Sequence, residues 1–277
     1  MASLRWRIIA NKIPMSHPIE ALRARIEALT APGVLLPDVE RLSVVTCGTQ
    51  YHVEFFGNSF GDAYLDLCET LSSPDVAASI LSLSLRGIDE GANGTKNWDL
   101  EPLVSRGQEF PFLQTFSVEL NQPADHNRTI VASSYEEDGV IARFVSKCPR
   151  LVNLTVPSAP SSEFFNASLA SLRFLSVDAG YDTQDFLRNF GRSGGFSSLL
   201  CFEWGEYSEN YIDNWQESCT PFSDYEALFT SPAFHTVKRF VLRQPSLTAD
   251  QIAALRMLRP ELQFLVVRYS SEYARSK

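Results

Sequence analysis

"PRLVNLTV" at residues 149–156 and "ASLRFLSV" at residues 170–177 carry the same six-residue phrase, with apolar residues at its first, fourth and sixth places. The phrase reads Leu151, Leu154 and Val156 in the first copy, and Leu172, Leu175 and Val177 in the second. Side chains two residues apart point to the same side of a β-strand, so the fourth and sixth places share a face. Each phrase therefore predicts a short strand with one buried face.

The phrase recurs along the chain at irregular intervals. Four further copies have the apolar residues Leu113, Phe116 and Val118; Leu199, Phe202 and Trp204; Val237, Phe240 and Leu242; and Leu262, Leu265 and Val267. Two weaker copies have Ile80, Leu83 and Leu85, and Val39, Leu42 and Val44. One such strand cannot bury its face alone, whereas several stacked in parallel can. The alternative is an ordinary α/β sheet with accidental matches, and the number of copies favours a repeat.

Parallel strands need crossovers between them, and these are usually helices. Residues 138–148 place Val140, Ile141, Phe144 and Val145 on one helical face. Residues 182–191 open with an aspartate and end at a glycine, which is typical of a helix. Residues 248–258 predict a helix capped by Thr248, with an apolar face of Ile252, Leu255 and Leu258. Residues 17–29 predict another amphipathic helix.

The chain resembles the leucine-rich repeat proteins. "CPRLVNLTV" (148–156) resembles the opening of the helix-bearing, cysteine-containing repeat class. "ALFTSPAFHTVKRFVLRQPSLTADQIAAL" (227–255) is similar to repeats of bacterial cytosolic leucine-rich proteins, in which a small residue and a proline precede the strand and a helix follows. Residues 69–85 are a looser copy, and an acidic, tyrosine-containing insertion after Trp204-Gly205 also looks like those proteins.

This resemblance implies an α/β fold, an irregular leucine-rich-repeat solenoid with parallel strands on its concave face and helices on its convex face. The repeat domain covers residues 76–277, and residues 1–75 form an N-terminal helix and strand cap, within one continuous unit. The consensus asparagine after the strand occurs only as Asn121, and its other places hold Cys47, Ala159, Gly180, Tyr207 and Pro245. We therefore expect a distorted solenoid. The resemblance implies binding and no shared enzymatic activity.

Composition narrows the function classes. The chain of 277 residues is 44% hydrophobic, which is enough apolar material for a core. Its net charge of -9 disfavours nucleic-acid binding. Five cysteines without a CxxC spacing indicate reduced cytosolic thiols. The N-terminal residues lack the features of a signal peptide, and no stretch is long enough to span a bilayer. We expect a cytoplasmic protein without a membrane or nucleic-acid partner.

Candidate contact residues follow from the strand phrases and from the stretch between Cys201 and Cys219. The third, fifth and seventh places of a phrase face outward, which predicts a concave face with an acidic centre and a basic flank. The acidic and aromatic stretch adds contact area and attraction for a basic partner. The predicted contact residues are Glu119, Asp178, Glu203, Glu206, Tyr207, Glu209, Tyr211, Asp213, Trp215 and Arg243. The alternative is that the aromatic residues pack under a solvated loop.

No catalytic or metal-binding motif is present in the sequence. Asp125 and His126 are adjacent in a polar loop (121–129), which is a weak signal for catalysis. Residues 87–99 read as a flexible insertion, and residues 47–64 as a hairpin with its turn at Gly57-Asn58. We expect a non-enzyme with no cofactor and no metal.

The leading hypothesis is a protein-interaction module, most specifically a bacterial immunity-type protein that inhibits a basic toxin and is a monomer when free. The first alternative is a substrate-recognition adaptor of the F-box leucine-rich type, recruited through its N-terminal helix. The others are an enzyme with an unrecognised carboxylate site and a structural part of a larger assembly.

Overall fold

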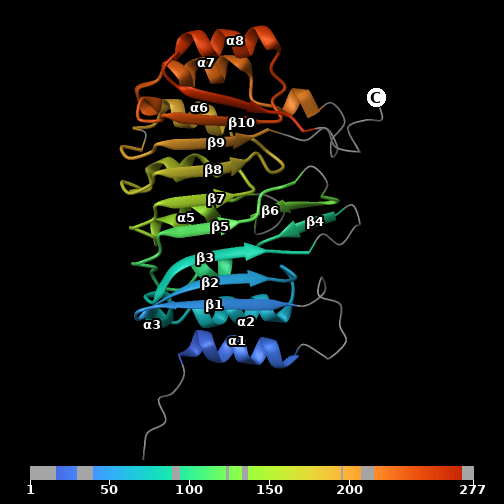
Figure 1. Ribbon diagram of the computed structural model, residues 1–277, viewed down its shortest axis with the longest axis vertical. Coiled ribbons are helices and arrows are strands. Elements are labelled where there is room, and N and C mark those ends of the chain that lie inside the picture. Colours follow the sequence, from blue (N-terminus) through green and yellow to red (C-terminus); the bar gives the residue numbers. More distant parts are fainter. Residues whose placement is uncertain are drawn as a thin grey trace, which may run out of the picture.

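The computed structural model describes residues 17–29, 40–88, 94–122, 125–132, 137–194, 196–206 and 215–269. Within these ranges the protein is a mixed α/β structure built on one nine-stranded sheet, whose strands stack along the long axis of the molecule (Figure 1). The strands, in their order across the sheet, are β1 (Arg41–Cys47), β2 (Gln50–Phe56), β3 (Ile80–Arg86), β5 (Thr115–Val118), β7 (Asn153–Val156), β8 (Phe174–Asp178), β9 (Cys201–Gly205), β10 (Arg239–Arg243) and β11 (Gln263–Val267). β1 and β2 are antiparallel, and every later neighbouring pair is parallel.

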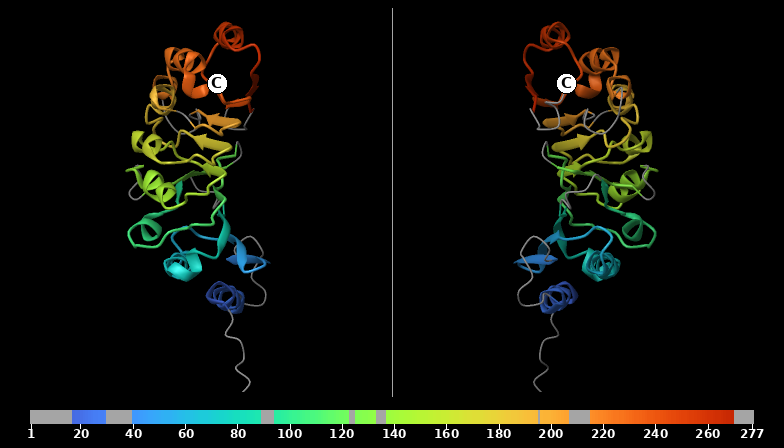
Figure 2. Two further views of the ribbon diagram at one scale, coloured as in Figure 1. Left: turned by 90° about the vertical axis from the view of Figure 1, so that its left-hand side faces the viewer. Right: turned by 90° about the vertical axis from the view of Figure 1, so that its right-hand side faces the viewer.

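The helices cover one face of this sheet, and no described helix or strand covers the other (Figure 2). They are α1 (Pro18–Leu29), α2 (Asp62–Leu71), α3 (Pro74–Ala77), α4 (Glu101–Val104), α5 (Val140–Ser146), α6 (Phe186–Arg192), α7 (Phe222–Thr230) and α8 (Ala249–Leu258), with the short 3-10 helices η2 (Ser162–Asn166), η3 (Trp215–Ser218) and η4 (Pro232–Phe234). α1 lies against β1 at one end of the sheet, and α8 lies at the other end (Figure 1). We call the uncovered side the open face.

The strand phrases are confirmed as strands, and their fourth places form one buried row. In register across the parallel strands this row is Leu83, Phe116, Leu154, Leu175, Phe202 and Phe240, and β11 continues it with Phe264, the third place of the last phrase. The rings of Phe202 and Phe240 stack at 5.3 Å, and those of Phe240 and Phe264 at 5.4 Å. Burying each of these side chains contributes about 1.5–3 kcal/mol, so the row is a main source of stability.

The last phrase was predicted one residue out of register. Phe264 points into the core, whereas Leu265 is 36% exposed on the open face. The parallel pairing with β10 sets Phe264 opposite Phe240, where the two rings stack. Placing Leu265 in the core would move Phe264 to the outside, because a shift of one residue exchanges the two faces of a strand.

The predicted hairpin with a Gly57-Asn58 turn is wrong. The hairpin consists of β1 and β2, and its turn contains Gly48 at φ +63°. After Gly57 the chain enters α2 instead of a second strand. The sheet runs without a break across the predicted boundary at residues 75 and 76, because β2 pairs with β3.

The predicted flexible insertion and polar loop form a second sheet. β4 (Gly94–Asn97) and β6 (Asn127–Ile130) pair in parallel beside the large sheet (Figure 1). The amide of Asn121 accepts a hydrogen bond from Thr129 N at 2.7 Å and donates to Thr129 O at 3.1 Å. Asn121 therefore bonds to the backbone of β6 as a neighbouring strand would, which sequence periodicity does not reveal.

The helix predictions hold in part. α5 buries Val140, Ile141, Phe144 and Val145 as expected. Thr248 and Gln251 form a complete capping box at the start of α8, but Leu258 is exposed at its end. α6 begins only at Phe186, because the Asp182 carboxylate accepts Gln184 N and closes a turn before the helix.

Candidate functional site: the open face and its polar edge

The open face is polar over β3, β5, β7 and β8. Its side chains there are mostly small hydroxyls and an amide: Ser82, Ser84, Thr115, Ser117, Asn153, Thr155 and Ser176. They bond to one another across the strands, with Ser117 Oγ donating to Ser84 Oγ at 2.9 Å and Asn153 Nδ2 to Thr115 Oγ1 at 3.1 Å. Charged side chains lie at the carboxyl end of this part of the face, where Arg86 of β3 is 3.8 Å from Glu54 of β2.

Over β8 to β11 the open face carries large apolar side chains among charged ones. Phe174 of β8 is 43% exposed, and Val241 of β10 and Leu265 of β11, which pair with each other two and three strands away, are also partly exposed. The small side chain of Cys201 lies in register between Phe174 and Arg239. Because larger side chains stand on both sides of it, a hollow of about 260 Å³ forms there. We call this feature the apolar hollow; Glu203 also lines it.

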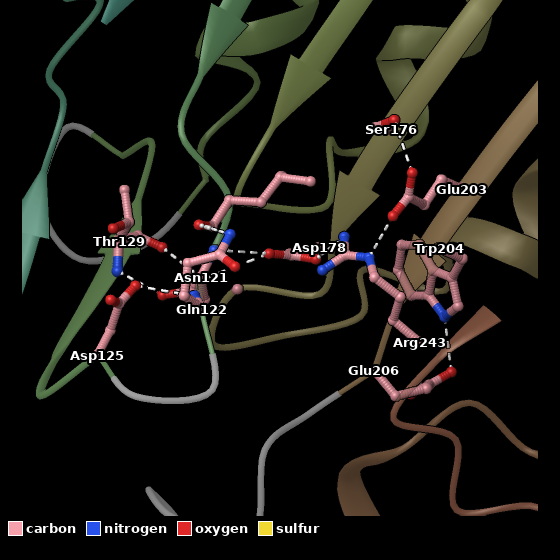
Figure 3. A network of polar contacts seen from close by, with 12 residues as sticks. Asn121, Gln122, Asp125, Thr129, Ser176, Asp178, Glu203, Trp204, Glu206 and Arg243 are labelled. Atoms are coloured by element: carbon pink, nitrogen blue, oxygen red, sulfur yellow. Dashed lines mark hydrogen bonds and ion pairs between the residues drawn. The ribbon is translucent and has the colours of Figure 1, made fainter. Parts of the chain in front are cut away.

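A network of charged side chains lies at the carboxyl ends of β8 to β10 (Figure 3). Arg243 Nη2 contacts Asp178 Oδ1 at 2.5 Å, and Arg243 Nε lies 2.6 Å from Glu203 Oε1. Nε is paired by charge only, since it has no hydrogen bond of acceptable geometry. Burial opposes the charge of Arg243, and the carboxylates Asp178 and Glu203 outweigh burial, so the pKa of Arg243 is raised.

The network requires glycine at position 205. A Cβ there would lie 2.1 Å from Asp178 Oδ1, well inside contact distance. The second oxygen of Asp178 accepts Asn121 N at 3.2 Å, and Asn121 in turn bonds to β6 (Figure 3). The network therefore connects β10 to the small sheet through Asp178 and Asn121.

Glu206 is the common acceptor of a second group of buried hydrogen bonds. It accepts hydrogen bonds from Trp204 Nε1 at 2.6 Å, from the Tyr225 hydroxyl and from Thr220 N at 3.2 Å. Burial raises the pKa of Tyr225, and the adjacent Glu206 carboxylate raises it further. Glu206 therefore joins the end of β9 to α7, and at 7% exposure it is not available to a partner on the surface.

The expected exposure of three predicted contact residues is wrong. Asp178, Glu206 and Arg243 are 5%, 7% and 7% exposed, because each is bonded within the chain. Glu119 is partly exposed, but it accepts Gly87 N at 2.8 Å and pairs with Lys96 Nζ at 2.7 Å. Most carboxylates of the predicted acidic centre are therefore paired or hydrogen-bonded within the chain.

The other predicted contact residues divide into two groups. Glu203 lies on the open face with about a third of its side chain exposed. Tyr207, Glu209, Tyr211 and Asp213 lie outside the described residues, and Trp215 begins η3. The structure therefore brings Glu203 together with Asp178 and Arg243, and it leaves the contact role of residues 207–214 as a prediction.

Sequence reasoning missed the apolar hollow. Phe174 occupies the third place of its phrase, which the outward-facing rule assigns to the open face, so a large aromatic at that place was the available signal. Cys201 carried no signal, because its position in the hollow depends on its neighbours in adjacent strands.

Comparison with known proteins finds no matching family model, no matching curated protein and no matching solved structure. Within the described ranges, no helix has the length and apolar character to cross a bilayer. The same ranges contain no group of three or more His, Cys, Asp or Glu side chains placed to hold a metal ion. The resemblance to leucine-rich repeat proteins stays a prediction.

Proposed function

We propose that this chain is a non-catalytic protein-interaction module of the irregular leucine-rich-repeat solenoid type, and that its open face is the docking surface. The apolar hollow carries this proposal. Phe174 and Val241 line it on a face that no described element covers, with Arg239 and Glu203 beside them. An apolar centre with polar residues at its rim is the usual composition of a protein interface.

A protein partner suits this surface better than a small molecule. The hollow measures about 260 Å³, which is below the range of about 300–1,000 Å³ for ligand pockets. The hydroxyl-bearing strands continue the surface away from the hollow. A partner that inserts one apolar side chain beside Cys201 and lies along these strands uses both parts.

The narrower form of the proposal is a cytoplasmic, bacterial immunity-type protein that covers a basic toxin. The net charge of -9 supports it, as do the acids between Glu203 and Glu217. Opposite charge speeds the encounter of two proteins and rejects partners of the same sign. Asp178 and Glu206 are not among the proposed contact residues, because their oxygens bond within the chain.

The test is affinity capture from a lysate of the native cell with wild type and matched variants. The hollow variant is Phe174→Ser with Val241→Ser, both of which line the hollow, and the control is Met257→Ser, which alters an 82% exposed side chain on α8. A partner held by wild type and by the control, and lost by the hollow variant, is the expected result. Circular dichroism confirms that all three proteins fold.

Other outcomes contradict parts of the proposal. A partner retained by the hollow variant places the docking surface elsewhere, and Glu209→Lys with Asp213→Lys then tests the acidic stretch. An acidic partner contradicts the toxin-inhibitor form. The absence of any specific partner contradicts the interaction module itself.

A further inference from the structure

A cavity of about 440 Å³ lies at the carboxyl ends of β7 and β8, next to β6 and away from the apolar hollow. Its walls include the segments that follow these strands, with Ser158, Ala159 and Ala179 among the lining residues. Its volume lies within the range of about 300–1,000 Å³ for small-molecule sites.

The backbone around the cavity is held in unusual conformations. Gly180 has φ +69°, and a Cβ there would lie 3.1 Å from the Cα of Ser158. Gln184 and Asp185 are not glycines, yet their φ values are 52° and 49°. A residue other than glycine is strained at such positive φ values, and the strain persists where the surrounding structure enforces it. The Gln184 side chain thereby becomes part of the cavity wall.

Ser158 offers an unused hydrogen-bond donor to the cavity. The residue is 5% exposed, and its Oγ accepts the backbone N–H of Val131 at 2.9 Å. The hydroxyl of Ser158 has no acceptor among the described residues. A buried hydroxyl that lines a cavity and lacks an acceptor can donate a hydrogen bond to a ligand oxygen.

The remaining polar lining consists of Tyr181, Gln184 and two acids, Glu137 and the exposed Asp182. The carboxyl of Glu137 is fixed by the backbone N–H groups of Gly139, Ile141 and Ser161, at 3.1, 2.9 and 2.8 Å. Asp182 uses one oxygen to accept Gln184 N at 2.7 Å, and its other oxygen has no hydrogen bond within the described ranges. The described lining contains no Lys, Arg or His; the adjacent Arg128 lies 5.4 Å from the centre of the Tyr181 ring and donates a hydrogen bond to Gly180 O.

We propose that this cavity binds a small primary amine that also carries hydroxyl groups. The ammonium lies between the carboxyl groups of Asp182 and Glu137, and the oxygen of a ligand hydroxyl accepts a hydrogen bond from the Ser158 hydroxyl. A ligand with a carboxylate or phosphate is disfavoured, because it would meet two carboxyl groups without a cationic side chain in the described lining. The proposal is independent of the open face and of the partner bound there.

The test is isothermal titration of the full chain with three matched probes. Glucosamine carries an ammonium and hydroxyls, glucose lacks the ammonium, and glucosamine 6-phosphate adds an anion. We expect glucosamine to bind more tightly than glucose by about tenfold or more, as for one charge-assisted hydrogen bond. Glucosamine 6-phosphate is expected to bind more weakly than glucosamine.

The matched variants are Asp182→Asn and Asp75→Asn. The first removes the charge in the cavity and keeps an oxygen to accept Gln184 N, and the second makes the same change on α3. Glucosamine affinity is expected to fall by about tenfold in Asp182→Asn and to be unchanged in Asp75→Asn. Glu137→Gln provides a second cavity variant if Asp182→Asn does not fold, as judged by thermal unfolding without ligand.

Three results overturn the proposal. The first is no binding of glucosamine up to its solubility limit. The second is equal binding of glucose, which removes the need for the ammonium. The third is an affinity for glucosamine that the folded cavity variant leaves unchanged.

Discussion

At the carboxyl edge of β8 and β10, Asp178 and Arg243 meet at 2.5 Å with less than a tenth of either side chain exposed. At the N-terminal end of the molecule, Arg25 of α1 and Asp66 of α2 meet at 2.9 Å with about half of each side chain in solvent. The chemistry of the two pairs is the same, and their separations are similar. The difference between them is desolvation, which decides what each pair does for the protein.

An exposed pair contributes little, because water and salt screen it and both side chains lose freedom. A buried pair also gains little over a well-packed apolar pair, but losing one member leaves an uncompensated charge in the interior. The same contrast bears on function. A carboxylate already bonded in the interior cannot contact a partner, whereas a surface carboxylate is available to one.

The contrast between interior and surface is expected to be largest for the cysteine thiols. Burial raises the pKa of Cys68 to about 12, with a smaller contribution from Asp99, whereas Cys47 is exposed. The raised pKa keeps the Cys68 thiol protonated at pH 8. An increase of about three pKa units lowers the thiolate fraction by about a thousandfold. Iodoacetamide at pH 8 should therefore modify Cys47 well before Cys68, as measured by mass spectrometry of the native protein.

Cys148 provides an internal control for this labelling. Burial also raises its pKa, and it should react only after unfolding in urea. Rapid labelling of Cys68 and Cys148 in the native protein would contradict the buried positions of α2 and of the segment after α5.

The next largest effect is expected from breaking the interior ion pair between Asp178 and Arg243. Arg243→Ala leaves Asp178 buried without its cation, and we expect the free energy of unfolding to fall by about 3–5 kcal/mol. Urea denaturation measures the loss. Arg243→Met with Asp178→Leu should recover most of it, since both charges are then removed. A loss below about 1 kcal/mol for Arg243→Ala would place the pair in the same class as surface pairs.

Glu206 is expected to show a smaller but clear effect. Glu206→Ala removes the acceptor for Trp204 Nε1 and the Tyr225 hydroxyl, and we expect a loss of about 2–3 kcal/mol. Glu217→Ala is the matched control, because Glu217 is exposed within the same acidic stretch. Equal losses in the two variants, measured by urea denaturation, would show that the bonds of Glu206 do not stabilise the fold.

The surface pair is expected to show the smallest effect. Arg25→Ala should change the free energy of unfolding by less than about 1 kcal/mol, and added salt should reduce the difference further. Thermal unfolding at low and at high salt measures both. A loss as large as that of Arg243→Ala would remove the distinction between the two regions.

Local patterns determined much of the fold. The period-two phrases give strands wherever a row of apolar side chains must be buried, and Leu83, Phe116, Leu154 and Leu175 fall in that row as predicted. The helical periodicity of residues 138–148 and the capping residues of α8 are equally local. These features depend on residues a few positions apart, so the sequence contains them in readable form.

The candidate site was far less predictable. The outward-facing rule finds Glu203 and would have found Phe174, because it uses only the alternation within a strand. It fails at Asp178 and Arg243, which are 65 residues apart in the chain and neutralise each other. It also fails at β11, where the pairing with β10, and not the local pattern, sets the register.

The sequence by itself determined that this protein has parallel strands with crossover helices, an excess of negative charge and no recognisable catalytic motif. Only the tertiary structure decided which acids are interior and which are exposed, where the apolar hollow forms, and that residues 94–97 and 127–130 pair as a second sheet. The reason is physical. Strand and helix periodicity is local along the chain, whereas desolvation, charge pairing and register depend on side chains that only folding brings together.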